Sequence, residues 1–130
     1  MPSPQEIYER YVGAGAIRRD ADAVADLFTE DGVFEAPLVP PGHPFPARLK
    51  GRAEIRRGLG EYYRRPQPAT GAVDAGRSRL VLHLPASELL IAEVDAVFVD
   101  GSSVSLVQIF RLQDGLIASL RDYFHPDVMG

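Results

Sequence analysis

The 130-residue sequence contains no cysteine and no tryptophan, and it has only three histidines. Without cysteine there can be no disulfide, no thiolate nucleophile and no metal site with sulfur ligands. The histidines, His43, His83 and His125, are scattered without the spacing of metal ligands, so we expect no metal site. No glycine-rich phosphate loop follows a predicted strand, which argues against a nucleotide cofactor. We therefore expect a protein that works without cofactors.

Long hydrophobic runs and an excess of basic residues are also missing. No apolar stretch approaches the ~18 residues that a membrane span needs. The N-terminus has neither the basic start nor the apolar stretch of a signal peptide, so we expect a cytoplasmic protein with no membrane partner. The 14 Lys and Arg against 18 Asp and Glu give a net charge of −4, which argues against nucleic acid as a partner. The length fits one domain, 1–130.

Apolar residues at helical spacing predict three helices in the first half of the chain. The first begins at Ser3-Pro4, with proline at the first helical position. The second covers 20–32 and the third 51–63, and a short strand (33–36) and a proline-rich loop (37–46) lie between them. The buried faces of the three helices are predicted to consist of Ile7, Tyr11, Ala14 and Ile17; of Val24, Leu27 and Phe28; and of Ile55, Leu59 and Tyr62.

The second half of the chain has the pattern of four strands, over 80–84, 89–99, 103–112 and 116–124. Asp-Gly pairs, strong hairpin signals, separate the last three. Helices followed by an antiparallel meander predict an α+β domain with three N-terminal helices on one face of a curved, mixed but mostly antiparallel sheet. Both faces of strand 89–99 are apolar, and helices can cover only one. The other face predicts a homodimer through the outer side of the sheet.

Four polar residues interrupt the apolar strand faces: Glu93, Asp95, Gln108 and Asp122. Because alternate residues share a face, Asp122 lies between Leu120 and Phe124, and Glu93 and Asp95 lie together on their strand. If the pairing is in register, all four would converge on the helix-covered side. Two carboxylates in an apolar pocket can hold one protonated and one ionised member, as acid–base catalysis requires. The alternative is a structural role for Glu93 and Asp122 in ion pairs or at an exposed edge.

The order of these elements and four stretches of sequence, 22–34, 51–55, 110–117 and 121–124, are shared with a known superfamily. The chain resembles nuclear transport factor 2-like proteins, which include ketosteroid isomerases, SnoaL-like polyketide cyclases and limonene-epoxide hydrolases. The resemblance covers nearly the whole chain and implies a cone-shaped α+β barrel with a hydrophobic pocket. It does not imply one activity, because this fold hosts many.

The last predicted strand ends in Arg-Asp-Tyr-Phe, as it does in proteins of the limonene-epoxide hydrolase type. By this resemblance Asp122 and Asp95 match the two aspartates that activate water and protonate the epoxide. Glu93 stands where that family has its arginine. Phe34 and Ala36 stand where it has the residues that hold the water.

Similarity to ketosteroid isomerases implies another set of roles. Tyr11 matches the tyrosine of the oxyanion hole, and Gln108 matches the hydrogen-bonding aspartate beside it. Ala36 occupies the position of the base. The resemblance to SnoaL-like cyclases implies that a single sheet carboxylate, Asp122, is the acid–base group for a ring closure.

The sequence therefore predicts a SnoaL-like enzyme that cyclises, isomerises or opens the epoxide of a small apolar molecule. The predicted catalytic residues are Asp122, Asp95 and Tyr11. The predicted substrate-binding residues are Gln108, Glu93, Phe34, Leu120, Phe124 and Tyr62. The alternative is a non-catalytic, dimeric module of the same fold that binds a small molecule.

Overall fold

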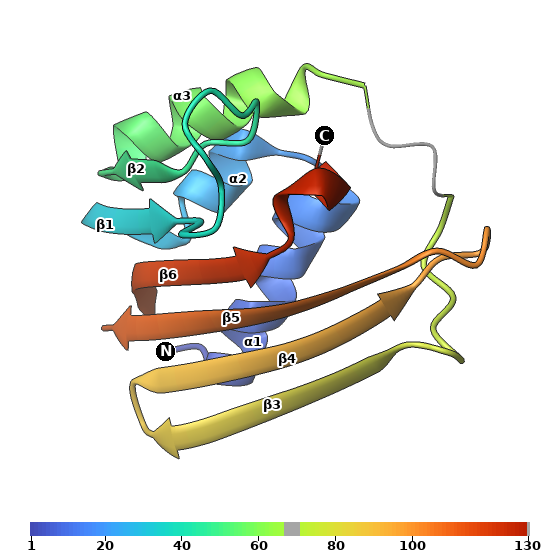
Figure 1. Cartoon of the computed structure of the whole chain (residues 1–130). Coiled ribbons are helices and arrows are strands. Elements are labelled where there is room, and N and C mark those ends of the chain that lie inside the picture. Colours follow the sequence, from blue (N-terminus) through green and yellow to red (C-terminus); the bar gives the residue numbers. More distant parts are fainter. Residues whose placement is uncertain (67–70, 130) are drawn as a thin grey trace.

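The computed structural model describes residues 1–66 and 71–129, and it contains a curved sheet with helices packed against it (Figure 1). The helices are α1 (Pro4–Val12), which continues into a π-helical turn (Gly13–Ile17), α2 (Ala21–Ala25), α3 (Arg52–Tyr63) and a C-terminal 3₁₀ turn (Pro126–Met129). The strands are β1 (Phe28–Glu35), β2 (Arg48–Lys50), β3 (Arg79–Ala86), β4 (Leu89–Val97), β5 (Ser103–Gln113) and β6 (Leu116–Phe124). Among the described residues, no helix is both long and apolar enough to cross a membrane.

The six strands form one sheet in the order β2-β1-β6-β5-β4-β3. The predicted meander is confirmed, since β3, β4, β5 and β6 pair in sequence and antiparallel. β1 adds to the sheet parallel to β6, and β2 pairs antiparallel with β1. The sheet is therefore mixed but mostly antiparallel, as predicted, within an α+β fold.

The first helix begins as predicted but changes its winding after Val12. Ser3 and Glu6 form a capping box, in which each side chain accepts a hydrogen bond from the other residue's backbone at 3.2 Å. In the π turn, Arg18 N donates to Gly13 O, five residues back. The wider turn rotates the following residues, so Ile17, predicted to be buried, is 73% exposed.

The predicted second helix is wrong in its length, because it ends at Ala25 rather than at Gly32. From Phe28 onward the chain is a strand that pairs with β6, and Ile117 N donates to Leu27 O at 2.8 Å. Val24 and Phe28 are both fully buried, which explains why their spacing resembled one helical stripe. Contacts with a strand nearly 90 residues later in the chain override the local helical pattern here.

The third helix is confirmed, with Ile55, Leu59 and Tyr62 buried. It is preceded by a short strand, β2, in a stretch between the predicted loop (37–46) and the predicted helix (51–63) for which no strand was predicted. Gly51 forms the N-cap of the helix with φ +89°, a conformation that favours glycine.

Candidate functional site

Asp122 lies on β6 with its side chain on the helix-covered face of the sheet. It is only 7% exposed, and it is directly opposite Gln108 of β5, which is equally buried. Gln108 Nε2 donates a long hydrogen bond of 3.4 Å to Asp122 Oδ2. Oδ1 of Asp122 is buried and has no hydrogen-bond partner among the described residues. A buried polar atom without a partner is costly, and it marks a position where a polar group of a bound molecule can be recognised.

Apolar side chains surround this carboxyl group. Leu120 and Phe124 flank Asp122 on the same face of β6, and Phe34 of β1 is paired with Leu120. All three are buried. The structure thus brings the predicted lining residues Phe34, Leu120 and Phe124 together beside Asp122.

Three tyrosines from the helices, Tyr8, Tyr11 and Tyr63, interact electrostatically with Asp122. Tyr8 and Tyr11 of α1 pack edge-on against Phe110 of β5, with ring centroids 5.6 and 5.4 Å apart. Tyr63 is the last residue of α3. Burial raises the pKa of all three phenols, and the charge of Asp122 raises each pKa further. The phenols therefore remain protonated near neutral pH and can act as hydrogen-bond donors close to the carboxyl group.

Tyr63 was not among the predicted site residues, and the structure shows how it is held. Arg19 donates from Nη2 to the Tyr63 carbonyl at 3.2 Å, and its guanidinium lies 5.0 Å from the centre of the Tyr63 ring. Burial raises the pKa of Tyr63 to about 12 although the Arg19 charge opposes the rise. A Cβ on Gly15 would lie 3.2 Å from the Tyr63 hydroxyl, so the glycine in the π turn leaves room for the phenol.

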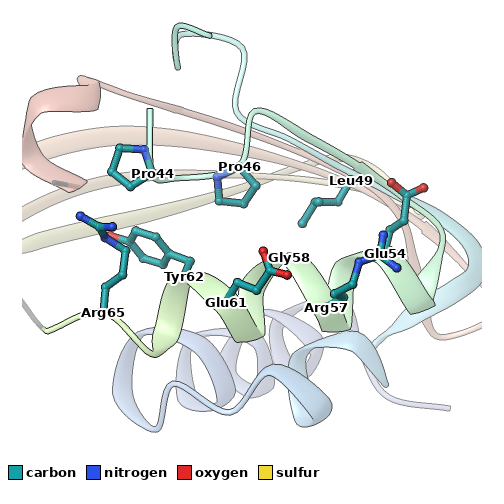
Figure 2. A pocket seen from close by; sticks show the side chains of 9 residues that line it. All are labelled: Pro44, Pro46, Leu49, Glu54, Arg57, Gly58, Glu61, Tyr62 and Arg65. Atoms are coloured by element: carbon teal, nitrogen blue, oxygen red, sulfur yellow. The ribbon is translucent and has the colours of Figure 1, made fainter. Parts of the chain in front are cut away.

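Tyr62, which was predicted to bind the substrate, is buried against Phe45 of the proline-rich loop, with ring centroids 4.8 Å apart. It also lines a cleft on the molecular surface (Figure 2). Tyr62 and Tyr63 follow Leu59 by three and four residues, and both spacings fit one helical face. The tyrosine doublet was the signal from which Tyr63 could have been found.

The environment of Asp122 changes its acidity. Burial raises the pKa of Asp122 from 3.8 to about 7, although the hydrogen bond from Gln108 acts in the opposite direction. Near neutral pH the carboxyl group is present in both its protonated and its ionised form. A single side chain of this kind can accept a proton and then return it.

The expectation that Asp95 faces Asp122 is wrong. Asp95 of β4 is paired with Ser105 and lies on the outer face of the sheet, where it is exposed. Its Oδ1 accepts a hydrogen bond of 2.7 Å from the Ser105 hydroxyl, and Arg79 lies 3.8 Å from its Oδ2. Since alternate residues of a strand point to opposite faces, Asp95 cannot act on a molecule bound beside Asp122.

Glu93 is on the same outer face, so the prediction that it lines the site is also wrong. It forms a 2.5 Å contact with His83 of β3, and both side chains are about half exposed. The face of β4 that points to the helices carries Ala92, opposite Gln108. In the described part of the chain, no three side chains of the metal-binding types lie together as a metal site would require.

Comparisons with known proteins agree with this architecture. The family model of the SnoaL-like domain matches residues 8–120. A search of the curated proteins finds no significant match. A candidate isomerase from Bacillus subtilis is 25% identical, with a TM-score of 0.69, and the match covers 95% of this chain and 87% of that protein.

Two further solved structures share the fold at lower identity. A hypothetical protein of ketosteroid isomerase-like fold from Catenulispora acidiphila, crystallised with trimethylamine, is 18% identical, with a TM-score of 0.63 over 94% of this chain and 86% of its own. A candidate ketosteroid isomerase from Kribbella flavida is 20% identical, with a TM-score of 0.57 over 91% of this chain and 74% of its own. The solved structures share the α+β fold, and the match to the family model shows that this chain belongs to the SnoaL-like domain family.

Proposed function

We propose that this SnoaL-like domain is an enzyme that uses Asp122 as its one acid–base group, to isomerise or cyclise a small apolar carbonyl compound. The proposal rests on the environment of the Asp122 carboxyl group. It is buried among apolar side chains, it has one oxygen without a partner among the described residues, and burial raises its pKa to about 7. A group with these properties is poised to exchange protons at neutral pH.

The chemistry follows from the position of this oxygen. Oδ1 of ionised Asp122 removes a proton from the carbon next to the carbonyl group, and the electron pair moves to the carbonyl oxygen. The Tyr11 hydroxyl donates a hydrogen bond to the resulting enolate oxygen. In an isomerisation, Asp122 returns the proton to another carbon of the enolate. In a cyclisation, the enolate carbon attacks a second carbonyl group, and the new alkoxide takes the proton from Asp122.

Epoxide opening is a weaker proposal for this chain. In that reaction one carboxyl group activates water while a second protonates the epoxide oxygen. Asp95, the expected second group, lies on the outer face of the sheet against Ser105. Among the described residues, Asp122 is the only buried carboxyl group. A reaction that needs one carboxyl group therefore fits this site better.

The reaction class can be tested without knowing the natural substrate. We would incubate the protein with a panel of cyclic ketones in deuterated water and follow the loss of α-protons by NMR. The wild type is expected to accelerate the exchange, and Asp122→Asn is expected to abolish the acceleration. Asp95→Asn is the matched control on the outer face and should exchange as fast as the wild type. An Asp122→Asn variant with full activity would refute the role of Asp122.

A non-catalytic binding module is the second candidate, and the same observation favours it. One buried carboxyl group with Gln108 and the phenols beside it can recognise a hydroxyl or carbonyl group without transforming the molecule. Binding of ketones without proton exchange would support this alternative.

We also propose that the outer face of the sheet forms a homodimer. Val107, in the middle of β5, is 36% exposed on this face. Ile91 and Ile109, its neighbours on the same face, are only partly buried in the single chain. Apolar side chains exposed together on a sheet favour association with a second copy. The mass of the protein in solution tests this proposal.

A further inference from the structure

Phe45 of the proline-rich loop contacts both the side chains beside Asp122 and a side chain that lines a surface cleft. It is 5% exposed, although it belongs to a segment without regular secondary structure. Its ring packs against Phe124 and Phe34, with centroids 5.1 and 5.9 Å away. These are the residues that line the site beside Asp122.

The Phe45 ring also packs against Tyr62, which lines a surface cleft of about 430 Å³ between the loop and α3. Figure 2 shows Pro44 and Pro46, the neighbours of Phe45, on the loop side of this cleft, and Tyr62 on the helix side. Leu49 adds a further apolar surface to it. Apolar surface therefore runs from the cleft through Tyr62 and Phe45 to the side chains beside Asp122.

The loop holds Phe45 in this place through one imidazole ring. His43 Nδ1 accepts a hydrogen bond of 3.0 Å from the Phe45 backbone N–H. Since this nitrogen is an acceptor, the proton of the neutral ring is on Nε2, which donates to the Pro126 carbonyl at 3.0 Å. Pro126 begins the 3₁₀ turn directly after β6, the strand of Asp122. At the base of the loop, Ala36 N donates to Ala47 O at 2.8 Å.

We infer that Phe45 is a specificity-determining residue, whose ring closes the site beside Asp122 against the cleft and so limits the length of the molecules that the site accepts. His43 positions this residue. The inference rests on the proposed function, since it assigns the size of the ligand bound at the same site: compact apolar molecules are accepted, and those with a long chain opposite the carbonyl or hydroxyl group are rejected. Shortening Phe45 would join the site to the cleft and remove this limit.

The test uses 4-methylphenol and 4-hexylphenol as probes, because a phenol resembles an enol and can hydrogen-bond to the unpaired oxygen of Asp122. Isothermal titration would give the affinity of both probes for the wild type and for Phe45→Ala. We expect the wild type to bind 4-methylphenol more tightly. We expect Phe45→Ala to shift the ratio of the two affinities toward 4-hexylphenol by about tenfold or more, through burial of the added methylene groups.

The matched control is Phe28→Ala, which removes an equally large and fully buried ring from β1. Phe28→Ala should leave the ratio of the two phenol affinities unchanged, because a general loss of packing would affect the binding of both probes alike. If either alanine variant does not fold, Phe45→Leu and Phe28→Leu replace the pair. A ratio that Phe45→Ala or Phe45→Leu leaves at the wild-type value would overturn the inference.

If neither probe binds the wild type, the proposed function has failed. A second measurement then tests whether Phe45 closes the site beside Asp122. Carbon-13 NMR would follow the titration of the Asp122 carboxyl group. Opening the site to water from the cleft should lower the pKa of Asp122 by about one unit or more in Phe45→Ala and leave it unchanged in Phe28→Ala. An unchanged pKa in Phe45→Ala would then overturn the role of Phe45 as a closure.

Discussion

Asp122 links the stability of this protein to its proposed activity. The folded protein binds the Asp122 proton more tightly than the unfolded chain does, because burial raises the pKa of this group from 3.8 to about 7. Between about pH 4 and about pH 7, the folded state keeps a proton that the unfolded state has lost. The contribution of Asp122 to the free energy of unfolding therefore decreases as the pH rises through this window, by at most on the order of 4 kcal/mol.

Urea unfolding at about pH 5 and about pH 8 would measure this effect in the wild type and in Asp122→Asn. The asparagine side chain stays neutral at both pH values, so the variant should lose less stability than the wild type over the same interval. An equal loss in both proteins would show that Asp122 does not titrate in this window.

A second substitution tests the role proposed for Tyr11. Its phenol is the proposed donor to the enolate oxygen, so Tyr11→Phe should slow the exchange of ketone α-protons by on the order of 100-fold while the chain still folds. Tyr123→Phe changes the tyrosine that follows Asp122 and lies on the opposite face of β6, and it should have no effect. Equal rates for the two variants would remove Tyr11 from the mechanism.

At the scale of elements, α3 contains two glycines whose surroundings differ. A Cβ on Gly60 would meet only the Ala21 methyl at 3.7 Å, so Gly60→Ala should raise the free energy of unfolding by up to about 1 kcal/mol. A Cβ on Gly58 would lie 2.5 Å from Leu49 Cδ2, and Leu49 would have to move.

We therefore expect Gly58→Ala to be less stable than Gly60→Ala by about 1 kcal/mol or more, although both gain the same helix propensity. Urea unfolding of the two variants checks this order. A reversed order would mean that the contact of Leu49 with Gly58 does not limit the packing between β2 and α3.

The elements differ in how far the sequence could predict them. The strands of the meander were predictable because Asp-Gly turns and alternating residues are local signals. Three features could not be predicted from the sequence: the π turn, the early start of β1 at Phe28 and the strand β2. Each of them depends on contacts with residues distant in the sequence, such as the pairing of Phe28 with Ile117.

In the candidate site, too, some residues could be predicted from local signals and others could not. Asp122 and Gln108 were found from their positions on strands where only one face is strongly apolar. β4 is apolar on both faces, so residue alternation alone could not tell which one the helices cover. The register with β5, which pairs Ala92 with Gln108, decides this and places Asp95 outside. Tyr63 could have been selected from the tyrosine doublet at the end of α3. That its hydroxyl lies beside Gly15 of the π turn depends on tertiary packing, which the sequence pattern does not give.

At the scale of the whole molecule, the proposed dimer makes a simple prediction. The wild type should sediment with the mass of two chains, and Val107→Lys, which places a charge in the middle of the outer face, should sediment as a single chain. Leu38→Lys is the matched control, because Leu38 is an exposed apolar residue of the proline-rich loop. A wild type that sediments as a single chain would contradict the proposal.

The central claim is that the fold keeps one carboxyl group in a state where it can gain or lose a proton at neutral pH. The most direct test is a carbon-13 NMR titration of the aspartate carboxyl groups, with the Asp122 signal assigned by its absence from Asp122→Asn. The structure predicts that this signal titrates with a pKa of about 7. A titration near the ordinary aspartate value of about 4 would contradict the account.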